Sequence, residues 1–402
     1  QTEPLTGPQR LFEDGKVLFE RHDYAAARQT LERYLQDKDR GVSHEEVDYM
    51  LACTAYELQL PDALRQLQMY LEAYPESRYR NRVQSLIGSA YFFEGNYEAA
   101  LRAYQQVNID LLGDTERDEC ALRLGTSYLK MNDLDEAYIW FSVIRAASSK
   151  YAADARYNLA YIDYVKQRYD QAWEGFSAVK DQPEYAALAP YYLADIQLIH
   201  NNYRQALQLA DAYLQAYPQQ EFVPQMQRIA GEAHYGLKDY AAAIPLLEAY
   251  HDAVDFPARN AMYRLGMSYF NTGVYSKAAL RLGEAAGPQD AMSQNAYLHM
   301  GLSYLQLRDR SRARMAFEQA ATTNFDPRAK EQALYNYALC IHETSYSPFA
   351  ESVTVFERLL NEYPNSPYAD RVNDYLVEVY MNTLLLSSIL MPISTSKLST
   401  HN

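Results

Sequence analysis

Residues 88–104 read GSAYFFEGNYEAALRAY, and residues 125–141 and 266–282 repeat the pattern as GTSYLKMNDLDEAYIWF and GMSYFNTGVYSKAALRL. In all three segments, a leading glycine is followed by apolar or aromatic residues 3, 9 and 16 positions later and by alanine 12 positions later. A fixed recurrence of this size is typical of a repeat array, in which stacked copies of one small unit share a continuous core. The sequence therefore predicts an extended binding surface rather than an enclosed catalytic cavity.

Ten copies of this pattern follow one another, each marked by a small anchor residue. The intervals between anchors run from 34 to 38 residues, and in eight copies the second alanine of the pattern is read in register. The copy at Cys53 has a shortened turn. The copy at Ala338 carries two extra residues around 345–348, so that Ser352 and Phe356 take the places of the alanine and the aromatic residue. The anchors are Gly15, Cys53, Gly88, Gly125, Ala160, Ala194, Gly231, Gly266, Gly301 and Ala338.

Each copy is predicted to be two short helices joined by a polar turn. The anchor and the residue three positions later share one helix face, and glycine or asparagine marks turns such as Gly95-Asn96 and Asn132-Asp133. The second helix begins near the next aromatic residue and carries the alanine. Small residues are expected at both positions because larger side chains would hold two closely crossing helices apart.

This pattern resembles the tetratricopeptide repeat, a helix–turn–helix unit of about 34 residues. The resemblance covers residues 10–380 and implies an all-α, right-handed superhelical solenoid of about ten helix–turn–helix repeats. Residues 1–9 would form an N-terminal extension. Residues 381–402 would form an atypical tail, which we interpret as a disordered or capping segment, a truncated array or an altered reading frame. The tryptophan that this family usually carries near the start of the first helix is mostly replaced by polar residues or tyrosine.

Connections after the second helices read Tyr-Pro-x-Ser at 74–77 and 363–366, and a third begins Tyr217-Pro218. This ending is similar to that of tetratricopeptide proteins of the Gram-negative cell envelope, including outer-membrane assembly lipoproteins. The resemblance implies a periplasmic or outer-membrane-associated protein, with a cytoplasmic location as the alternative. The apolar run at 384–391 is too short to cross a bilayer, which takes about 20 residues in a helix, so any membrane association would come through a partner.

The net charge of −15 argues against nucleic acid as a partner, because nucleic-acid affinity comes largely from lysine and arginine side chains that neutralise phosphates. The one local basic run, between Arg308 and Arg314, has an alternate-residue spacing that would wrap around a helix instead of forming one face. Cys53, Cys120 and Cys340 are too far apart to pair in a solenoid, where only neighbouring repeats touch.

No arrangement of residues points to catalysis. The eight histidines form no His-Glu-x-x-His motif and no pair four residues apart, and the chain contains neither a phosphate-binding loop nor a nucleophile elbow. Carboxylate pairs such as Glu45-Glu46 lie at expected helix starts, where they complement the helix dipole. We therefore expect no enzyme activity, no catalytic residue, no metal site and no cofactor.

The 38 tyrosines are the other unusual feature. Many fall at repeat positions that pack between helices. A second set falls on the first helix, at places that face the concave groove in the proteins that this chain resembles. Aromatic side chains give a large contact area at a low entropic cost, which suits partner binding; the alternative is that neighbouring first helices bury them. The candidate partner-binding residues are Phe92, Tyr161, Tyr164, Tyr191, Tyr235, Tyr263 and Phe270.

These observations favour a non-enzymatic scaffold that binds a peptide or protein partner in its concave groove, within a bacterial envelope complex if the narrower resemblance holds. The alternative is a module that binds glycans or cell wall, since an aromatic groove can also stack on sugar rings.

Overall fold

The computed structural model describes residues 7–36, 44–344 and 349–390, the backbone alone at 349–350 and 386–390. This part of the chain forms 21 α-helices and one 3₁₀ helix, with no strand among them. Two compact units divide the helices, Gln1–Ala189 and Pro190–Asn402. The first unit holds α1 (Gly7–Glu20), α2 (Tyr24–Gln36), α3 (His44–Glu57), α4 (Ala63–Ala73), α5 (Arg80–Phe93), α6 (Tyr97–Tyr104), η1 (Ile109–Leu111), α7 (Asp114–Lys130), α8 (Leu134–Phe141), α9 (Ala152–Val165) and α10 (Tyr169–Val179).

The second unit contains five further helix pairs and one additional helix. Its elements are α11 (Ala189–Ile199), α12 (Tyr203–Ala216), α13 (Val223–Gly236), α14 (Tyr240–Ala253), α15 (Arg259–Asn271), α16 (Tyr275–Ala285), α17 (Ala291–Gln306), α18 (Arg310–Thr322), α19 (Pro327–Thr344), α20 (Phe349–Glu362) and α21 (Ala369–Leu390).

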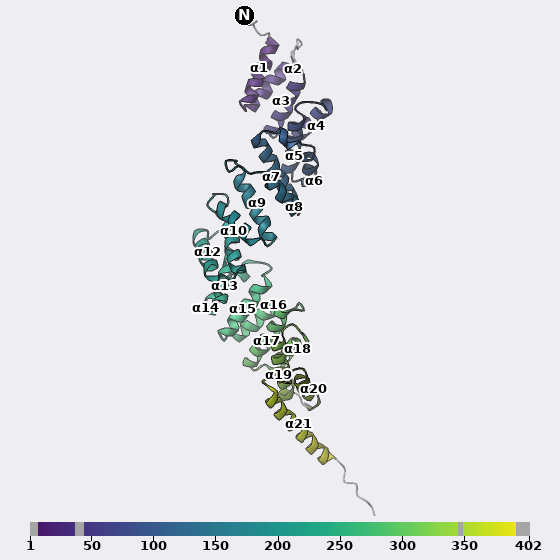
Figure 1. Ribbon diagram of the computed structural model, residues 1–402, viewed down its shortest axis with the longest axis vertical. Coiled ribbons are helices and arrows are strands. Elements are labelled where there is room, and N and C mark those ends of the chain that lie inside the picture. Colours follow the sequence, from purple (N-terminus) through teal and green to yellow (C-terminus); the bar gives the residue numbers. More distant parts are fainter. Residues whose placement is uncertain (1–6, 37–43, 345–348, 391–402) are drawn as a thin grey trace, which may run out of the picture. The chain divides into compact units, whose positions relative to one another are not determined.

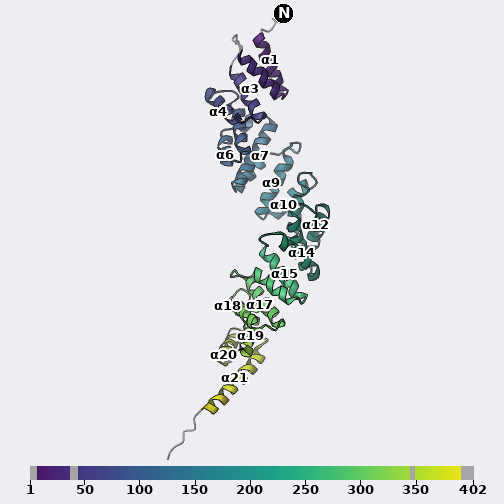
Figure 2. The ribbon, with the colours of Figure 1, turned by 180° about the vertical axis from the view of Figure 1, so that it is seen from behind.

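Within each unit, consecutive helices of the chain pack on one another, as the ribbon shows from both sides (Figures 1 and 2). Helices α11 and α12 do so through a shared core of Ala194, Leu198, Ala206 and Ala210. The odd-numbered helices are the first helices of the repeats, and several of them also touch the first helix of the next repeat. The predicted all-α repeat solenoid is therefore confirmed, and its ten helix pairs correspond to the ten anchors.

All ten anchors are buried, as the sequence predicted. Each glycine anchor lies under the side chain 16 residues later. A Cβ built on Gly88 would lie 2.7 Å from the ring of Tyr104, and one on Gly301 would lie 2.5 Å from that of Phe317. The alanines 12 residues after the anchors are also completely buried. Close helix crossing thus explains the small residues at both positions.

The turn inside each repeat adopts one recurring geometry. The residue about seven positions after the anchor is left-handed in all nine turns that the structure describes, and the following backbone N–H closes the turn back to the first helix. In several copies, the next residue caps the second helix, as when Asn96 Oδ1 accepts the N–H of Ala99 at 3.1 Å. Glycine occupies the left-handed position at Gly95 and Gly273, but Gln167, Lys238 and Arg308 occupy it elsewhere.

The helical structure extends beyond the limits that we expected at residues 10 and 380. Helix α1 begins at Gly7, and α21 continues to Leu390. The final residues 391–402 and the expected insertion at 345–348 lie outside the described residues, so the separate C-terminal tail stays a prediction. No helix in the described part of the chain has the length and apolar character needed to span a membrane.

Candidate functional site

The seven aromatic residues proposed to bind a partner all lie on first helices, and all seven side chains are half-buried. They form one group of three in the first unit and one group of four in the second. Their role in binding stays a prediction. The first group is Phe92 on α5 with Tyr161 and Tyr164 on α9, and the second is Tyr191 on α11, Tyr235 on α13, and Tyr263 and Phe270 on α15.

Four of these rings make the same contact inside their own repeats. Each lies four residues after its anchor and meets, edge to face, the tyrosine that begins the second helix. This contact fixes the angle at which the chain enters the second helix, so the rings have a structural role whether or not they bind a partner. The centroid distances are 5.7 Å for Phe92–Tyr97, 5.9 Å for Tyr164–Tyr169, 5.7 Å for Tyr235–Tyr240 and 5.8 Å for Phe270–Tyr275.

Tyr191 makes a different contact, which joins two repeats. Its ring stacks on Phe222 at 4.7 Å, and Phe222 ends the connection that begins at Tyr217-Pro218. The other two Tyr-Pro connections end in the same way, because Tyr79 stacks on Tyr49 at 3.9 Å and Tyr368 stacks on Tyr335 at 4.2 Å. The aromatic residue that ends each Tyr-Pro connection is therefore explained by the packing of one repeat on the next.

A row of buried ion pairs crosses the first helices of the second unit. The Arg228 guanidinium donates to Asp195 at 2.7 Å and to Glu232 at 3.1 Å, and Arg264 also pairs with Glu232. The side chain of Glu232 is only 2% exposed, and that of Asp195 is 9% exposed. Each acid is matched by a base, so this charge ladder holds α11, α13 and α15 together without presenting net charge. The sequence did not predict this ladder.

The surroundings of the ionisable groups on this surface keep each of them in one protonation state at neutral pH. Burial alone would lower the pKa of the Arg228 guanidinium, but Glu232 and Asp195 raise this pKa above its ordinary value. Burial raises the pKa of Tyr235, and it raises that of Tyr263 to about 12. Both phenols therefore stay protonated at neutral pH and offer hydroxyl groups rather than negative charges to a partner.

The first unit contains a pocket of about 610 Å³ that was not expected from the sequence. It is bounded by the end of α3, the turn into α4, and helices α5 and α7. The apolar part of its wall includes Leu64, Leu86 and Phe93, and the Phe93 side chain is 67% exposed. Phe93 is the neighbour of the predicted residue Phe92, but it lies one position beyond the places that the family pattern assigned to the groove.

Two arginines line this pocket, and both already have carboxylate partners. Arg82 lies 3.1 Å from Glu116, and Arg123 donates to Glu119 at 2.7 Å and also to Ser89. The Arg123 guanidinium lies over the Phe93 ring, 4.8 Å from its centroid. The positive charge in the pocket is therefore largely neutralised.

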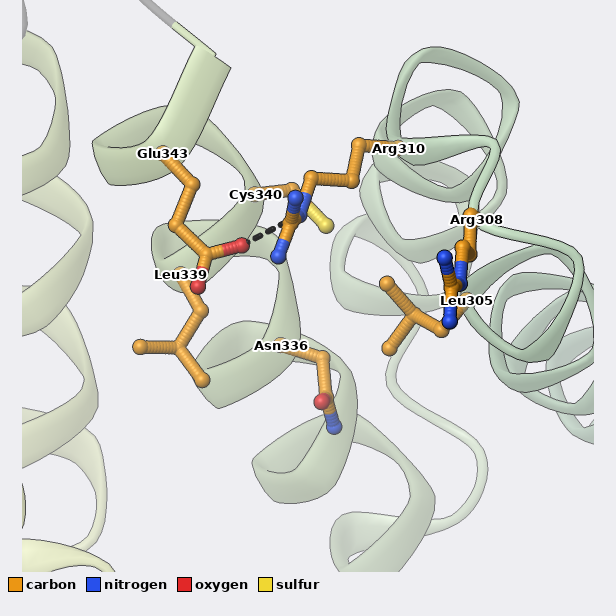
Figure 3. Close-up of a pocket in the computed structure, with 7 residues that line it drawn as sticks. All are labelled: Leu305, Arg308, Arg310, Asn336, Leu339, Cys340 and Glu343. Atoms are coloured by element: carbon orange, nitrogen blue, oxygen red, sulfur yellow. Dashed lines mark ion pairs between the residues drawn. The ribbon is translucent and has the colours of Figure 1, made fainter.

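A second pocket, of about 490 Å³, lies between the α17–α18 turn and α19 in the second unit (Figure 3). The picture shows Arg310 reaching Glu343, and their charged atoms are 2.5 Å apart. Two more arginines of the predicted basic run are also paired, Arg312 with Asp309 at 2.6 Å and Arg314 with Glu351 at 2.5 Å. Three of the four arginines of the run are therefore paired with carboxylates.

One group of side chains among the described residues is of the kinds that bind metal ions. Oxygen and nitrogen atoms of Glu248, His251 and Asp252 lie within 4.8 Å of one another. The sequence did not predict this group, because it contains a single histidine, His251. Arg281 already binds two of these three side chains, donating to Glu248 at 2.8 Å and to His251 Nε2 at 2.9 Å. A cation would have to displace this guanidinium, so the cluster is best explained as an ion-pair network.

The three cysteines are buried and unpaired, in agreement with the expectation from their spacing. Burial raises the pKa of the Cys53 and Cys120 thiols to about 12 and that of Cys340 to about 11. Because the thiolate is the reactive form, these thiols are poor nucleophiles and poor metal ligands at neutral pH.

Comparisons with known proteins agree with this architecture. Models of the tetratricopeptide repeat match residues 46–77, 82–108, 230–291, 295–323 and 332–366. No curated protein matches the sequence significantly.

Several solved structures are similar to the chain. A tetratricopeptide repeat protein from Parabacteroides merdae ATCC 43184 is 14% identical over 62% of this chain and 95% of that one, with a TM-score of 0.41. The Cut9–Hcn1 hetero-tetramer of the APC/C is 12% identical over 93% of this chain and 96% of that one, with a TM-score of 0.39. YrrB, a tetratricopeptide repeat protein with an unusual peptide-binding site, is 16% identical over 52% and 96%, with a TM-score of 0.37.

Proposed function

The chain belongs to the tetratricopeptide repeat family, and from this premise we propose that it is a non-enzymatic scaffold whose first helices hold a peptide or protein partner. The observation that carries the proposal is the half-burial of the first-helix aromatic residues in five of the repeats. A half-buried ring is held in one orientation by its neighbours and still presents an edge or a face to a partner. Such rigid aromatic side chains lose little entropy on binding.

A protein partner suits these rings better than a glycan does. Sugar stacking requires an accessible ring face, and Phe222 covers one face of Tyr191 at 4.7 Å. The rings of Tyr235 and Phe270 lie against the tyrosines that begin their second helices. The buried charge ladder beside Tyr235 offers a partner no unpaired charge, which favours contacts made through ring edges, hydroxyl groups and backbone.

We also propose that the protein works in the periplasm or at the outer membrane, where a partner would provide any link to the membrane. The Tyr-Pro-x-Ser connections support this proposal through their likeness to those of envelope proteins. Their aromatic ends also have a packing role, so the location needs its own test. Fractionation of the source cells should recover the native protein with periplasmic or membrane markers; recovery with cytoplasmic markers would exclude this location.

The binding role of the aromatic residues can be separated from their packing role by replacing, in separate variants, each of the two rings of a pair with alanine. Tyr235→Ala and Tyr240→Ala remove the same ring contact, but only Tyr235 lies on a first helix. The immobilised full chain would capture partners from the source cells for identification by mass spectrometry. If Tyr235 is a binding anchor, its loss should weaken affinity for the captured partner about thirtyfold, whereas Tyr240→Ala should retain binding.

The pair Tyr164→Ala and Tyr169→Ala gives the same comparison in the first unit. Thermal unfolding of all four variants would measure the shared packing contribution. Equal loss of stability within each pair, with capture retained by all four variants, would contradict the proposed role of these rings in binding. Capture of no protein by the unmodified chain would contradict the scaffold function itself.

A further inference from the structure

The pocket of the first unit has an unbalanced charge at its mouth. Glu94 lines the pocket, follows the last residue of α5 and is exposed. Its carboxylate has no hydrogen bond or ion pair with any residue that the structure describes. The carbonyl groups at the end of α5 add partial negative charge at the same place. A positively charged group of a partner would therefore be attracted to this mouth.

Phe93 provides the apolar half of the same surface. Its side chain is 67% exposed, although it lines a concave space that also includes Leu64 and Leu86. Large exposed aromatic side chains at the edge of a pocket are typical of binding anchors, because covering them removes apolar surface from water. A partner that fills this space must bring an apolar side chain of its own.

The arginines of the pocket do not make it a site for anions. Arg82 pairs with Glu57 and Glu116, and Arg123 pairs with Glu119. An acidic ligand would have to break these pairs and would also approach the carboxylate of Glu94. A basic ligand meets neither cost, and its charge would gain from the carboxylate of Glu94. The Phe93 ring already lies under the Arg123 guanidinium, so it offers the ligand apolar contact rather than a second cation–π pair.

We propose that this pocket binds an extended segment of a partner protein in which an apolar side chain is followed, within two residues, by lysine or arginine. The apolar side chain enters the pocket against Phe93 and Leu86, and the basic side chain pairs with Glu94 at the mouth. This inference rests on the proposed scaffold function and names the chemistry of one segment that the scaffold would hold.

Selection of peptides on the full chain tests this proposal without knowledge of the natural partner. A random twelve-residue library displayed on phage would be panned on the immobilised protein. Peptides with an apolar residue followed closely by lysine or arginine should be enriched. Enrichment of acidic peptides, or of apolar peptides without a basic residue, would overturn the proposal.

The variants then assign the enriched peptides to the pocket. Synthetic peptides with a fluorescent label should bind Phe93→Ala about thirtyfold more weakly, the loss that a central anchor gives. Glu94→Lys should lower the affinity for the basic peptide about tenfold. Exchange of the peptide's basic residue for glutamate should restore binding to this variant. Charge reversal that restores binding cannot result from unfolding of the protein.

Two exposed residues of the same unit provide matched controls. Ile139→Ala shortens an apolar side chain that is 57% exposed on α8, and Glu76→Lys reverses an exposed charge in the α4–α5 connection. Both variants should keep the affinity of the unmodified chain. If the peptides bind but Phe93→Ala and Glu94→Lys behave as the controls do, the pocket is not the site, although the scaffold function stands.

An unsuccessful panning also has a defined meaning. If no peptide is enriched while the full chain still captures a protein partner, the pocket proposal is overturned and the scaffold function is kept. If neither experiment yields a bound segment, the scaffold function fails together with the pocket.

Discussion

Gly125 lies directly beneath the ring of Phe141, so that a Cβ built on the glycine would lie 2.7 Å from Cε1 of the ring. Real Cβ atoms do not approach other heavy atoms this closely. The two residues are 16 positions apart and belong to α7 and α8, the two helices of one repeat. Because the ring is completely buried, it cannot move aside into solvent. The absence of a side chain at residue 125 therefore sets how closely the two helices cross.

Gly125→Ala should destabilise the protein, although alanine favours a helix over glycine by about 1 kcal/mol. Overpacking a close contact costs about 1–3 kcal/mol, so we expect a lower midpoint of urea unfolding. Gly283 offers a matched control, because its added Cβ would meet only Met300 at an ordinary 3.6 Å. Gly283→Ala should be neutral or stabilising. In a Phe141→Ala background, Gly125→Ala should also cease to destabilise; a persistent loss there would contradict the proposed clash.

Ala278→Leu should be costly for the same reason at the second small position. Ala278 is completely buried on α16, and the extra atoms of leucine should cost about 1–3 kcal/mol. Ala241→Leu is the control, because Ala241 is exposed near the start of α14 and should change stability by less than about 0.5 kcal/mol. Thermal unfolding of both variants measures the difference. Equal midpoints would show that Ala278 does not lie at a close crossing.

The sequence predicted the repeat because its strongest signals are local and steric. Every anchor had to be small, and every anchor is buried at a helix crossing. The turns were only partly predictable. Glycine or asparagine marks the left-handed residue at Gly95 and Asn132, but Gln167 and Lys238 adopt the same geometry. There the hydrogen bonds of the turn and the packing of both helices impose a backbone shape that the local residues disfavour.

The candidate site was less predictable because its interactions join different repeats. The partners Arg228 and Asp195 are 33 residues apart, and Arg264 and Glu232 are 32 apart. A search for charges four residues apart on one helix cannot find such pairs, whereas a search for opposite charges one repeat apart could have done so. Half-burial is likewise invisible in sequence, since the ring of Tyr235 can contact a helix and a partner at the same time.

Lys238→Gly should stabilise the protein, because Lys238 has a φ of 62° in an exposed turn. A residue with a side chain pays roughly 1–2 kcal/mol in the left-handed conformation, and glycine avoids this cost but gains more freedom in the unfolded chain. We expect a net gain of about 0.5–1 kcal/mol in the free energy of unfolding. Gln208→Gly, at an exposed position inside α12, should instead lose about 1 kcal/mol.

Chelation should leave stability unchanged, because Arg281 already pairs with Glu248 and His251, two of the three residues that could hold a cation. Its guanidinium pairs with Glu248 at 2.8 Å, and Tyr269 donates a further hydrogen bond to the same carboxylate at 2.8 Å. Thermal unfolding with EDTA should superimpose on unfolding without it, and added Zn²⁺ should not raise the midpoint. A drop caused by EDTA that Glu248→Gln abolishes would show instead that the cluster binds a metal ion.

Stability should fall as the pH drops below about 6.5, in part because of His299. Burial lowers the pKa of this imidazole, and a hydrogen bond from Nδ1 to the carbonyl of Asn295, at 2.8 Å, only partly opposes that effect. The folded chain therefore takes up its proton at a lower pH than the unfolded chain does. Between these two pKa values the unfolded chain binds more protons, so acidification favours unfolding.

The variant His299→Phe should remove this part of the pH dependence. It keeps an aromatic ring beside Phe270, which meets the imidazole edge to face at 5.0 Å. Urea unfolding at pH 8, 7, 6 and 5 would compare each protein with its own value at pH 8, which cancels the change in packing. The unmodified chain should lose more stability than the variant between pH 7 and pH 5. Parallel curves would mean that the folded chain protonates His299 as readily as the unfolded chain does, and that its burial does not oppose the charge.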